Sequence, residues 1–295
     1  MAVVETQSNA PVGRREFSWY RLQKSLGNSL WYVLLTSLSI LFSLPFFWML
    51  SSSLKIESRI WIYPPTWIPN PFLWENYPKA LELMHFAQLL KNTLFLTGIG
   101  TLAVVLSSSW IVYGFARIDF PGKNTLFMLL LATMMLPGQV TMIPRFILFK
   151  ELGWLNGYLP LLVPALFGDA FYIFLLRQFY MGIPTELDDA AKIDGCNYIG
   201  IWWRIILPLS KPALATVTVF SVIRGWNDFL WPLIILNDSK KFNLALGLAT
   251  FRGLYLTRWG YLMAASVVIL TPMVILYFFA QHFIVEGITL TGIKG

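Results

Sequence analysis

The stretch Thr185–Pro208, TELDDAAKIDGCNYIGIWWRIILP, organises the chain because it is a polar island between two long apolar runs. Thr185 follows a proline and is expected to cap a first helix with its side chain. Gly195 fits the end of that helix, because glycine adopts the left-handed conformation without strain. An apolar stripe at helical spacing follows and is expected to end at Pro208. The stretch therefore predicts two short helices joined by a tight turn.

The first of these helices is predicted to carry a smooth face of small side chains. Positions i, i+3, i+4 and i+7 share one side of a helix. Here they are Leu187, Ala190, Ala191 and Asp194. The first turns hold the acids Glu186, Asp188 and Asp189, where the helix dipole favours negative charge. Asp188 is also spaced to pair with Lys192. We expect this helix to dock into another protein.

A family motif lies in the same stretch. It consists of Asp189-Ala190-Ala191, Gly195, Ile205 and Leu207-Pro208, separated by three residues, nine residues and one residue. The pattern resembles the loop motif of ABC importer membrane subunits, with Asp189 in place of glutamate, which keeps the charge. In that family the loop is the coupling helix, which lodges in a cleft of a separate ATPase subunit. The alternative interpretation is an ordinary amphipathic cytoplasmic hairpin.

The resemblance implies a set of residues that couple this chain to an ATPase. They are Glu186, Asp188, Asp189, Ala190, Ala191, Asp194, Gly195, Ile205, Leu207 and Pro208.

The composition indicates an integral membrane protein. Of the 295 residues, 57% are hydrophobic and 13% are charged, against about 25% charged residues in soluble domains. The net charge of +7 comes from dispersed basic residues, which argues against a nucleic-acid partner. A single cysteine, Cys196, excludes an internal disulfide, and with His85 and His282 far apart no metal site is expected.

The predicted fold class is all-α, with six membrane-spanning helices. Each apolar run is long enough to cross about 30 Å of hydrocarbon. The runs are Leu30–Leu50, Thr93–Phe115, Thr125–Leu148, Gly157–Leu176, Pro212–Leu236 and Trp259–Phe283. The third is expected to break at Pro137-Gly138 and at Pro144. Residues 51–91 interleave Trp and Tyr with Pro, which predicts irregular chain at the membrane interface. A signal peptide is the rival interpretation of the first run, which is too long for it.

The domain organisation follows from these spans. Residues 1–28 are predicted to be a cytoplasmic segment, 29–283 the six-span domain with a coupling loop at 181–212, and 284–295 a cytoplasmic tail. Six spans put both termini on one side of the lipid bilayer. The excess of Lys and Arg on that side is small. The charges of the N-terminal segment and the need of the docking loop for ATP both favour the cytoplasm.

Charged side chains inside the spans predict a substrate path or gate. Such a charge costs about 2.5–3.5 kcal/mol at membrane depth, so we expect Asp169, Arg224 and Asp228 to face protein or water. Arg224 and Asp228 are spaced i, i+4, and a pair on one helix face is the structural interpretation of them. Neighbouring rings and amides suit a polyhydroxylated solute, and a packed polar cluster is the alternative. The candidate set is Asp169, Arg224, Trp226, Asn227, Asp228, Trp231, Gln139 and Arg145.

Signatures of catalysis are absent from the sequence. It contains no Gly-x4-Gly-Lys-Ser/Thr loop, and Gly98-x-Gly100-x-x-Ala103 lies inside a span, where small residues pack helices. The chain is therefore not expected to be an enzyme or to bind a cofactor, and ATP with Mg would be held by the partner ATPase. A rival hypothesis is a stand-alone channel or ion-coupled carrier that uses Asp169, Arg224 and Asp228 as a charge relay.

Other segments narrow the resemblance. They are MLPGQVTMIP (135–144), LGWLNGY (152–158), WNDFLWPL (226–233), MAAS (263–266) and the terminal GITLTGIKG. From about residue 30 to 295 the chain resembles the second, six-span subunit of carbohydrate-uptake ABC importers of the maltose-transporter type. This implies the type I ABC importer permease fold, alternating access and the inner (plasma) membrane of a prokaryote.

The resemblance also implies partners. They are a second permease subunit in a heterodimer, two ATPase subunits and an extracytoplasmic solute-binding protein. In that family the C-terminal tail also reaches the ATPase, so Gly292, Lys294 and Gly295 are candidate contacts. Disaccharide, oligosaccharide, polyol and glycerol phosphate all remain open as the solute.

Overall fold

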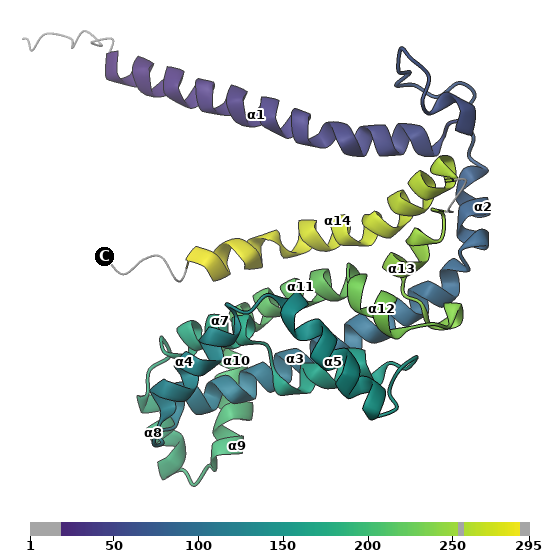
Figure 1. Cartoon of the computed structure of the whole chain (residues 1–295). Helices are drawn as coiled ribbons and strands as arrows, with labels where there is room; N and C mark the ends of the chain where they lie inside the picture. Colours follow the sequence, from purple (N-terminus) through teal and green to yellow (C-terminus); the bar gives the residue numbers. More distant parts are fainter. Residues whose placement is uncertain (1–18, 253–256, 290–295) are drawn as a thin grey trace, which may run out of the picture. The chain divides into compact units, whose positions relative to one another are not determined.

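The computed structural model describes residues 19–252 and 257–289 (Figure 1). Within them the regular structure is helical, and the one β-bridge, Arg252 with Thr257, is isolated. The α-helices are α1 (Trp19–Ser53), α2 (Asn76–Leu83), α3 (Phe86–Arg117), α4 (Lys123–Thr133), α5 (Gly138–Glu151), α6 (Leu159–Leu162), α7 (Ala170–Tyr180), α8 (Glu186–Ile193), α9 (Tyr198–Ile201), α10 (Leu207–Leu209), α11 (Lys211–Trp226), α12 (Leu230–Ile235), α13 (Leu244–Ala249) and α14 (Trp259–Thr289). Shorter turns are η1 (Glu57–Arg59), η2 (Val163–Phe167), η3 (Trp202–Ile206) and η4 (Ser239–Lys241).

The chain divides into two compact units, Met1–Trp48 and Met49–Gly295. The first contains most of α1, which passes through Pro45 without ending. The second contains the remaining helices and all the side chains discussed below.

Four of the six predicted runs overlap single candidate spans, and the third corresponds to a bent pair of helices. The fifth run shares only α11 with a second bent pair, whose other arm, Tyr198–Leu209, lies in the predicted coupling loop 181–212. The continuous spans are Ser29–Ser53, Phe86–Arg117, Leu159–Tyr180 and Trp259–Gln281. The pair α4 and α5 bends by 96°, and the pair Tyr198–Leu209 and α11 bends by 81°. Counting each bent pair as one span gives six, in agreement with the all-α membrane fold predicted above.

The break in the third span is confirmed at Pro137 but not at Pro144. Proline disfavours the helical conformation of the residue before it, so α4 and its last turn end there. Pro137 itself has the extended ψ of 133° and caps α5. Pro144, in contrast, lies inside α5, which continues to Glu151.

The fifth span is shorter than predicted. α11 ends at Trp226, and α12 begins only at Leu230, so the run Pro212–Leu236 is interrupted in its middle. Asn227 caps α11, and its side-chain amide donates to the carbonyl of Ile223 at 2.8 Å. The apolar composition hid this break, because the residues on both sides of it are hydrophobic.

α3 lies at the centre of the second unit, packed between α7 and α11. The contact with α11 is close: Thr101 Oγ1 and Ser221 Oγ lie 3.0 Å apart. A Cβ on Gly225 would meet Thr97 Cγ2 at 3.3 Å, so only a very small residue fits there. α3 therefore forms a rod with α8 at one end and α2 near the other (Figure 1).

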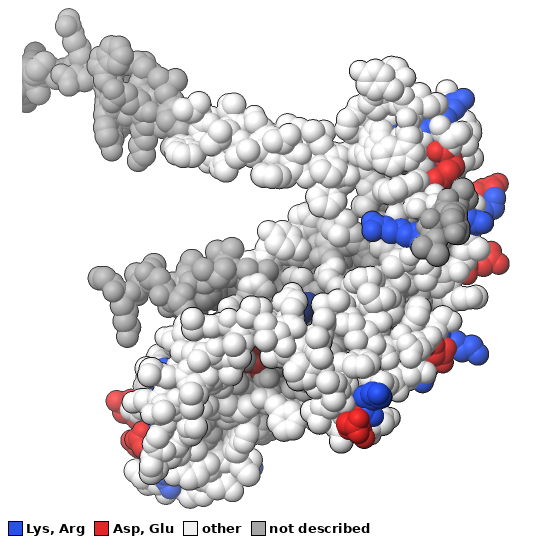
Figure 2. Space-filling view, viewed as in Figure 1, with Lys and Arg blue, Asp and Glu red and all other residues white. Residues whose placement is uncertain are grey.

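Charged side chains are distributed as a membrane protein requires. Figure 2 shows them mainly at the α8 end and at the opposite end of the second unit, with mostly uncharged surface between on this face. The predicted irregular segment 51–91 is confirmed only over 54–75, which contains η1, because α2 occupies Asn76–Leu83 and α3 begins at Phe86.

Candidate functional site

The helix α8 forms where the sequence predicts it, Glu186–Ile193, and stops at Gly195, which has φ +82°. The predicted side-chain cap is wrong. Thr185 has helical dihedrals, φ −72° and ψ −22°, whereas a capping residue needs an extended conformation. Instead, the carbonyl of Thr185 accepts from the backbone N–H of Asp188 at 3.0 Å, so the residue already belongs to the helical turn.

The predicted small-residue face of α8 is divided between two environments. Leu187, Ala190 and Asp194 are exposed, as are the acids Glu186 and Asp189. Ala191 is buried in the core cluster that contains α3 and α7. Only part of the face is thus available to a partner.

Large apolar side chains are exposed at the last residue of α8, in α9 and in η3 of the same hairpin. Ile193 is 88% exposed, Ile199 61% and Trp203 58%. Exposed apolar patches rimmed by polar residues mark sites of interaction. Ile193 lies outside every candidate span, whereas Ile199 and Trp203 belong to Tyr198–Leu209, the first arm of a bent pair.

Asp188 points back to the chain rather than out to a partner. Its carboxylate lies 3.6 Å from Arg117 Nε at the end of α3, and both side chains are buried. The predicted pair of Asp188 with Lys192 is wrong, because Lys192 bonds Asp189 at 3.0 Å. Burial raises the pKa of Asp188, and the charges of Arg117 and Lys192 oppose this.

One serine on α3 contacts both α7 and the second arm of the hairpin. Ser109 Oγ lies 2.7 Å from the hydroxyl of Tyr180 in α7 and accepts from Trp202 Nε1 at 3.0 Å. Arg117 Nη2 donates to the carbonyl of Ile183 at 2.7 Å. The hairpin is therefore held on the end of α3 at several points, and sequence reasoning had assigned none of them.

The second helix of the hairpin is irregular. Asn197 caps α9 by accepting from Gly200 N at 2.8 Å, a cap that its position after a tight turn signals. η3 is a π-helical turn, in which Leu207 N donates to Trp202 O. Pro208 lies at the start of α10 and does not end the helix, contrary to the prediction, and the chain bends after it at Ser210. Of the remaining motif residues, Ile205 is half-buried.

The predicted charged path is partly assembled. Asp169 caps α7, accepting from Phe171 N at 3.0 Å, and receives Arg224 Nη1 at 2.8 Å. The structural alternative, a pair of Arg224 with Asp228, does not form, because α11 ends between them and Asp228 leaves its helical face. The backbone carbonyl of Asp228 accepts from Asn243 Nδ2.

A glycine permits this arrangement of Asp169. Gly168 has φ +78°, and a Cβ there would lie 2.9 Å from Ile111 Cδ1 on α3. Any other residue would be strained by the positive φ and would displace the end of the Ile111 side chain. The close approach lets Ser108 Oγ accept from Asp169 N at 3.1 Å.

The other candidates of the path take different positions. Arg145 of α5 stacks over the ring of Trp231 in α12, 4.4 Å from its centroid. Trp226 is buried, and its Nε1 donates to Ile269 O of α14, so it serves packing. Gln139 is exposed in the first turn of α5, and Asn227 is exposed at the end of α11. Two contacts, Asp169 with Arg224 and Arg145 with Trp231, thus form the candidate path.

The C-terminal tail and the metal-ligating side chains remain to be described. Gly292, Lys294 and Gly295 lie outside the described residues. Among residues 19–252 and 257–289, no group of three or more His, Cys, Asp or Glu side chains is placed to hold a metal ion.

Comparisons with known proteins match this architecture. A family described as binding-protein-dependent transport system inner membrane component matches residues 111–289. The arabinooligosaccharides transport system permease protein AraQ of Bacillus subtilis is 33% identical over 290 residues, which are 95% of this chain and 98% of that protein. Its namesake in Halalkalibacterium halodurans is 38% identical over 204 residues, 69% of this chain and 73% of that protein.

A second named relative and a solved structure are also similar to this chain. The sn-glycerol-3-phosphate transport system permease protein UgpE of Yersinia pestis bv. Antiqua is 32% identical over 240 residues, 79% of this chain and 85% of that protein. The crystal structure of a bacterial ABC transporter involved in the import of the acidic polysaccharide alginate has a chain with the same fold, with a TM-score of 0.79. That match has 23% identity and covers 92% of this chain and 99% of the other. The chain described here therefore belongs to the inner membrane components of binding-protein-dependent transport systems, the permease subunits of ABC importers.

Proposed function

We propose that this permease carries a sugar, oligosaccharide or related polyol across the inner membrane by alternating access, driven by ATP hydrolysis on separate subunits. It would form a heterodimer with a second permease and work with two ATPase subunits, which hold ATP and Mg, and an extracytoplasmic solute-binding protein. The names of the relatives support this class of solute. The chain itself would bind no cofactor and catalyse no reaction. Both termini would lie in the cytoplasm.

The observation that carries the proposal is the hairpin 185–208. It presents the exposed apolar side chains of Ile193, Ile199 and Trp203, while its base is fixed to α3 by a buried ion pair. A surface that is apolar on the outside and rigid underneath fits a groove on a partner. The tail residues Gly292, Lys294 and Gly295 are proposed to add contacts to the same ATPase.

The mechanism proposed follows from that anchoring. When ATP closes the ATPase dimer, α8 moves with the groove that holds it. Because α3 holds the first arm through the pair Arg117–Asp188 and the second arm through Ser109 and Trp202, the displacement passes to α3 instead of being absorbed in the loop. ATP supplies the bias by binding the closed state more tightly than the open one.

The test is Gly195→Trp, with Gly195→Asn as the matched control. Space around Gly195 is open, and asparagine tolerates its positive φ. The control therefore adds a small side chain to the turn and keeps its backbone conformation. We expect Gly195→Trp to lower uptake and solute-stimulated ATP hydrolysis by about tenfold or more, the loss of about 1.4 kcal/mol of docking energy. The complex should still assemble in the membrane.

Two results would reject the proposal. One is normal uptake by the assembled Gly195→Trp complex. The other is transport by the isolated chain in liposomes without any ATPase, which the rival hypothesis of a stand-alone channel or carrier predicts. The pair Asp169–Arg224 is already satisfied within the chain, which disfavours its use as a relay by a lone subunit.

A further inference from the structure

The connection between α1 and α2 contains an uncharged segment. From Ile60 to Trp74 the sequence has no charged residue, and Arg59 and Glu75 flank this stretch. The segment includes three tryptophans, a tyrosine and a phenylalanine, and we call residues 60–74 the aromatic loop. The structure gives the aromatic loop neither helix nor strand. It is therefore an apolar segment without the regular backbone that a membrane span requires.

The aromatic loop lies where one span ends and another begins. The first span ends at Ser53, shortly before the loop, and the sixth begins at Trp259. Trp61 of the loop packs edge-on against the ring of Trp259, with 5.2 Å between the ring centroids. Glu57, just ahead of the loop, accepts from the backbone N–H groups of the first two residues of α14 at 2.7 and 2.9 Å. Because both spans reach the surface of the bilayer here, the loop lies at that surface.

Much of the apolar surface of the aromatic loop faces away from the rest of the chain. Tyr63 is 93% exposed, Ile68 77% and Trp74 66%. Trp61 remains 64% exposed despite its contact with α14. An exposed apolar surface of this kind marks contact with a membrane or with another protein.

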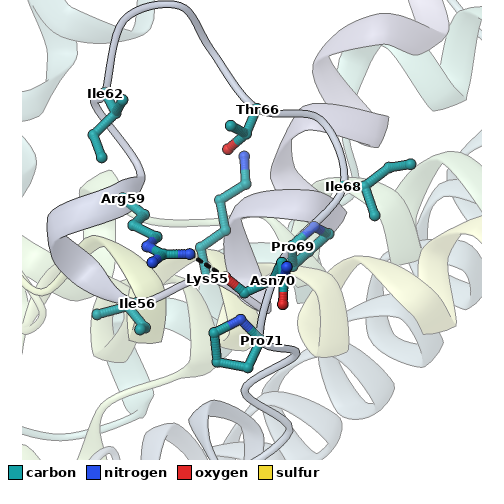
Figure 3. Close-up of a pocket in the computed structure, with 9 residues that line it drawn as sticks. All are labelled: Lys55, Ile56, Arg59, Ile62, Thr66, Ile68, Pro69, Asn70 and Pro71. Carbon is teal, nitrogen blue, oxygen red and sulfur yellow. Dashed lines mark hydrogen bonds between the residues drawn. The ribbon is translucent and has the colours of Figure 1, made fainter.

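The aromatic loop is closed at its base by two hydrogen bonds. Arg59 Nη1 donates to the carbonyl of Asn70, and Ser51 Oγ donates to the carbonyl of Trp67. Figure 3 shows the first of these bonds, with the side chain of Ile68 directed away from the middle of the loop. The exposed side chains are therefore carried on a loop whose two limbs are joined.

Three environments are open to such a loop, and two of them are unfavourable. Water would hydrate the exposed rings and isoleucine side chains, at a cost in free energy. The hydrocarbon core would leave the N–H and C=O groups of an irregular backbone without partners. The interface between them hydrates the backbone and contacts the rings, and tryptophan and tyrosine are enriched there.

We propose that the aromatic loop inserts its rings among the lipid headgroups of the leaflet opposite the hairpin 185–208 and thereby anchors the start of α14. Lipid is favoured over a protein partner because the loop adjoins two spans, and lipid surrounds a span wherever protein does not. Trp61 and Glu57 both contact the start of α14. The inserted loop therefore fixes the depth at which the sixth span begins.

The experiment measures the depth of a bimane fluorophore on the importer complex in nanodiscs of phosphatidylcholine and phosphatidylglycerol. The fluorophore is attached to Tyr63→Cys in the loop or, as the control, to Ser239→Cys. Ser239 is an exposed polar residue in η4. The carbonyl of its neighbour Lys240 accepts from Asn92 Nδ2 near the start of α3, which follows α2 at the same end of the unit. The unsubstituted complex, labelled in parallel, gives the signal from Cys196 and from the partner subunits.

Two quenchers report the environment of the label. One is a lipid that carries a nitroxide at its headgroup, and the other is iodide in water. At position 63 we expect the lipid-borne nitroxide to quench more strongly than iodide, because the label lies among headgroups. At position 239 we expect the reverse order, because a polar connection lies in water.

Two substitutions of Tyr63 test whether its ring drives insertion. Tyr63→Trp keeps an amphipathic ring, whereas Tyr63→Asp places a charge in the loop. With the fluorophore on Ile68→Cys, quenching by the lipid should persist in Tyr63→Trp and be lost in Tyr63→Asp. With the fluorophore on Arg258→Cys, just ahead of α14, Tyr63→Asp should raise quenching by iodide, because α14 loses its anchor. Tyr63 is almost fully exposed, so neither change disturbs packing, and the thermal midpoint of each complex checks this.

Four results would overturn the proposal. The first is stronger quenching by iodide than by the lipid at position 63. The second is shielding of position 63 from both quenchers, or shielding that appears only when the solute-binding protein is added, because either identifies a protein surface as the occupant. The third is the same lipid quenching at position 68 in Tyr63→Asp and Tyr63→Trp. The fourth, an unchanged label at position 258 in Tyr63→Asp, would remove the link to α14.

Discussion

Two Arg–Asp pairs join distant segments of this permease, and they differ in their environment. At the base of the hairpin, the side chains of Arg117 and Asp188 are 3% and 7% exposed, and their charged atoms lie 3.6 Å apart. In the candidate path, Arg224 and Asp169 are 73% and 25% exposed within this chain and lie 2.8 Å apart. The shorter pair is the more accessible one.

The difference indicates different roles. A buried pair is costly to break, because removing one partner leaves an unpaired charge out of water. An accessible pair costs little to break, because solvent replaces the partner. The pair Arg117–Asp188 therefore suits a joint that stays closed through the transport cycle. The pair Asp169–Arg224 suits a contact that opens when solute passes.

The largest effect is expected from Arg117→Gln. This change leaves the buried carboxylate of Asp188 without its cation, and we expect a loss of about 3–5 kcal/mol in the stability of the hairpin. The complex should unfold at a lower temperature, and uptake should fall more than basal ATP hydrolysis. The double variant with Asp188→Asn removes both charges and should recover part of the loss. Equal thermal midpoints for Arg117→Gln and wild type would contradict the proposal that the pair Arg117–Asp188 fixes the hairpin to α3.

A pH series sharpens this prediction. Burial raises the pKa of Asp188, so the folded protein keeps this proton to a higher pH than the unfolded chain does. Stability through this group therefore falls as pH rises from the ordinary aspartate range through the raised folded-state value. Arg117→Gln removes a charge that opposes the shift in the pKa of Asp188. The loss of stability of this variant relative to wild type should therefore become smaller as the pH is lowered. The measurement is the thermal midpoint against pH, and Asp188→Asn in the same background should remove this dependence.

A smaller effect is expected in the candidate path. A double-mutant cycle of Asp169→Asn with Arg224→Gln should give a coupling energy of about 1 kcal/mol or less, because the pair is accessible. Asparagine keeps the cap of α7, so the cycle isolates the ion pair. The cycle of Arg224→Gln with Asp228→Asn serves as control and should give a coupling near zero. A larger coupling energy in the control cycle would show that Arg224 interacts with Asp228 and not with Asp169.

The smallest effect is expected from Lys192→Ala. Its partner Asp189 and Lys192 itself are both well exposed on α8. Exposed pairs contribute about 0–1 kcal/mol, so the thermal midpoint of the complex should hardly change. Uptake measured at low and high salt checks whether the lysine acts on the ATPase instead. A thermal loss equal to that of Arg117→Gln would remove the distinction between buried and exposed pairs.

The sequence predicted what local rules govern. The extent of α8 and its stop at Gly195 follow from spacing and from the conformational freedom of glycine, and both are present. The i, i+4 spacing indicated Lys192 as the partner of Asp188 and Asp228 as the partner of Arg224, and neither ion pair forms. Asp188 and Arg224 both bond residues more than 50 positions away, and no pattern in a single sequence reports which distant helix comes near. The break after Trp226 was missed for a related reason, because hydropathy does not distinguish one long helix from two short ones.

The π-helical turn η3 overlaps the nine-residue spacing between Gly195 and Ile205 in the family motif. In this turn Leu207 N reaches back five residues to Trp202 O, so it holds one residue more than an α-helical turn would. Deleting one residue within η3 would convert the turn to regular α winding and remove the bulge. Protein engineers can therefore exchange side chains in η3, whereas the π turn itself requires its additional residue.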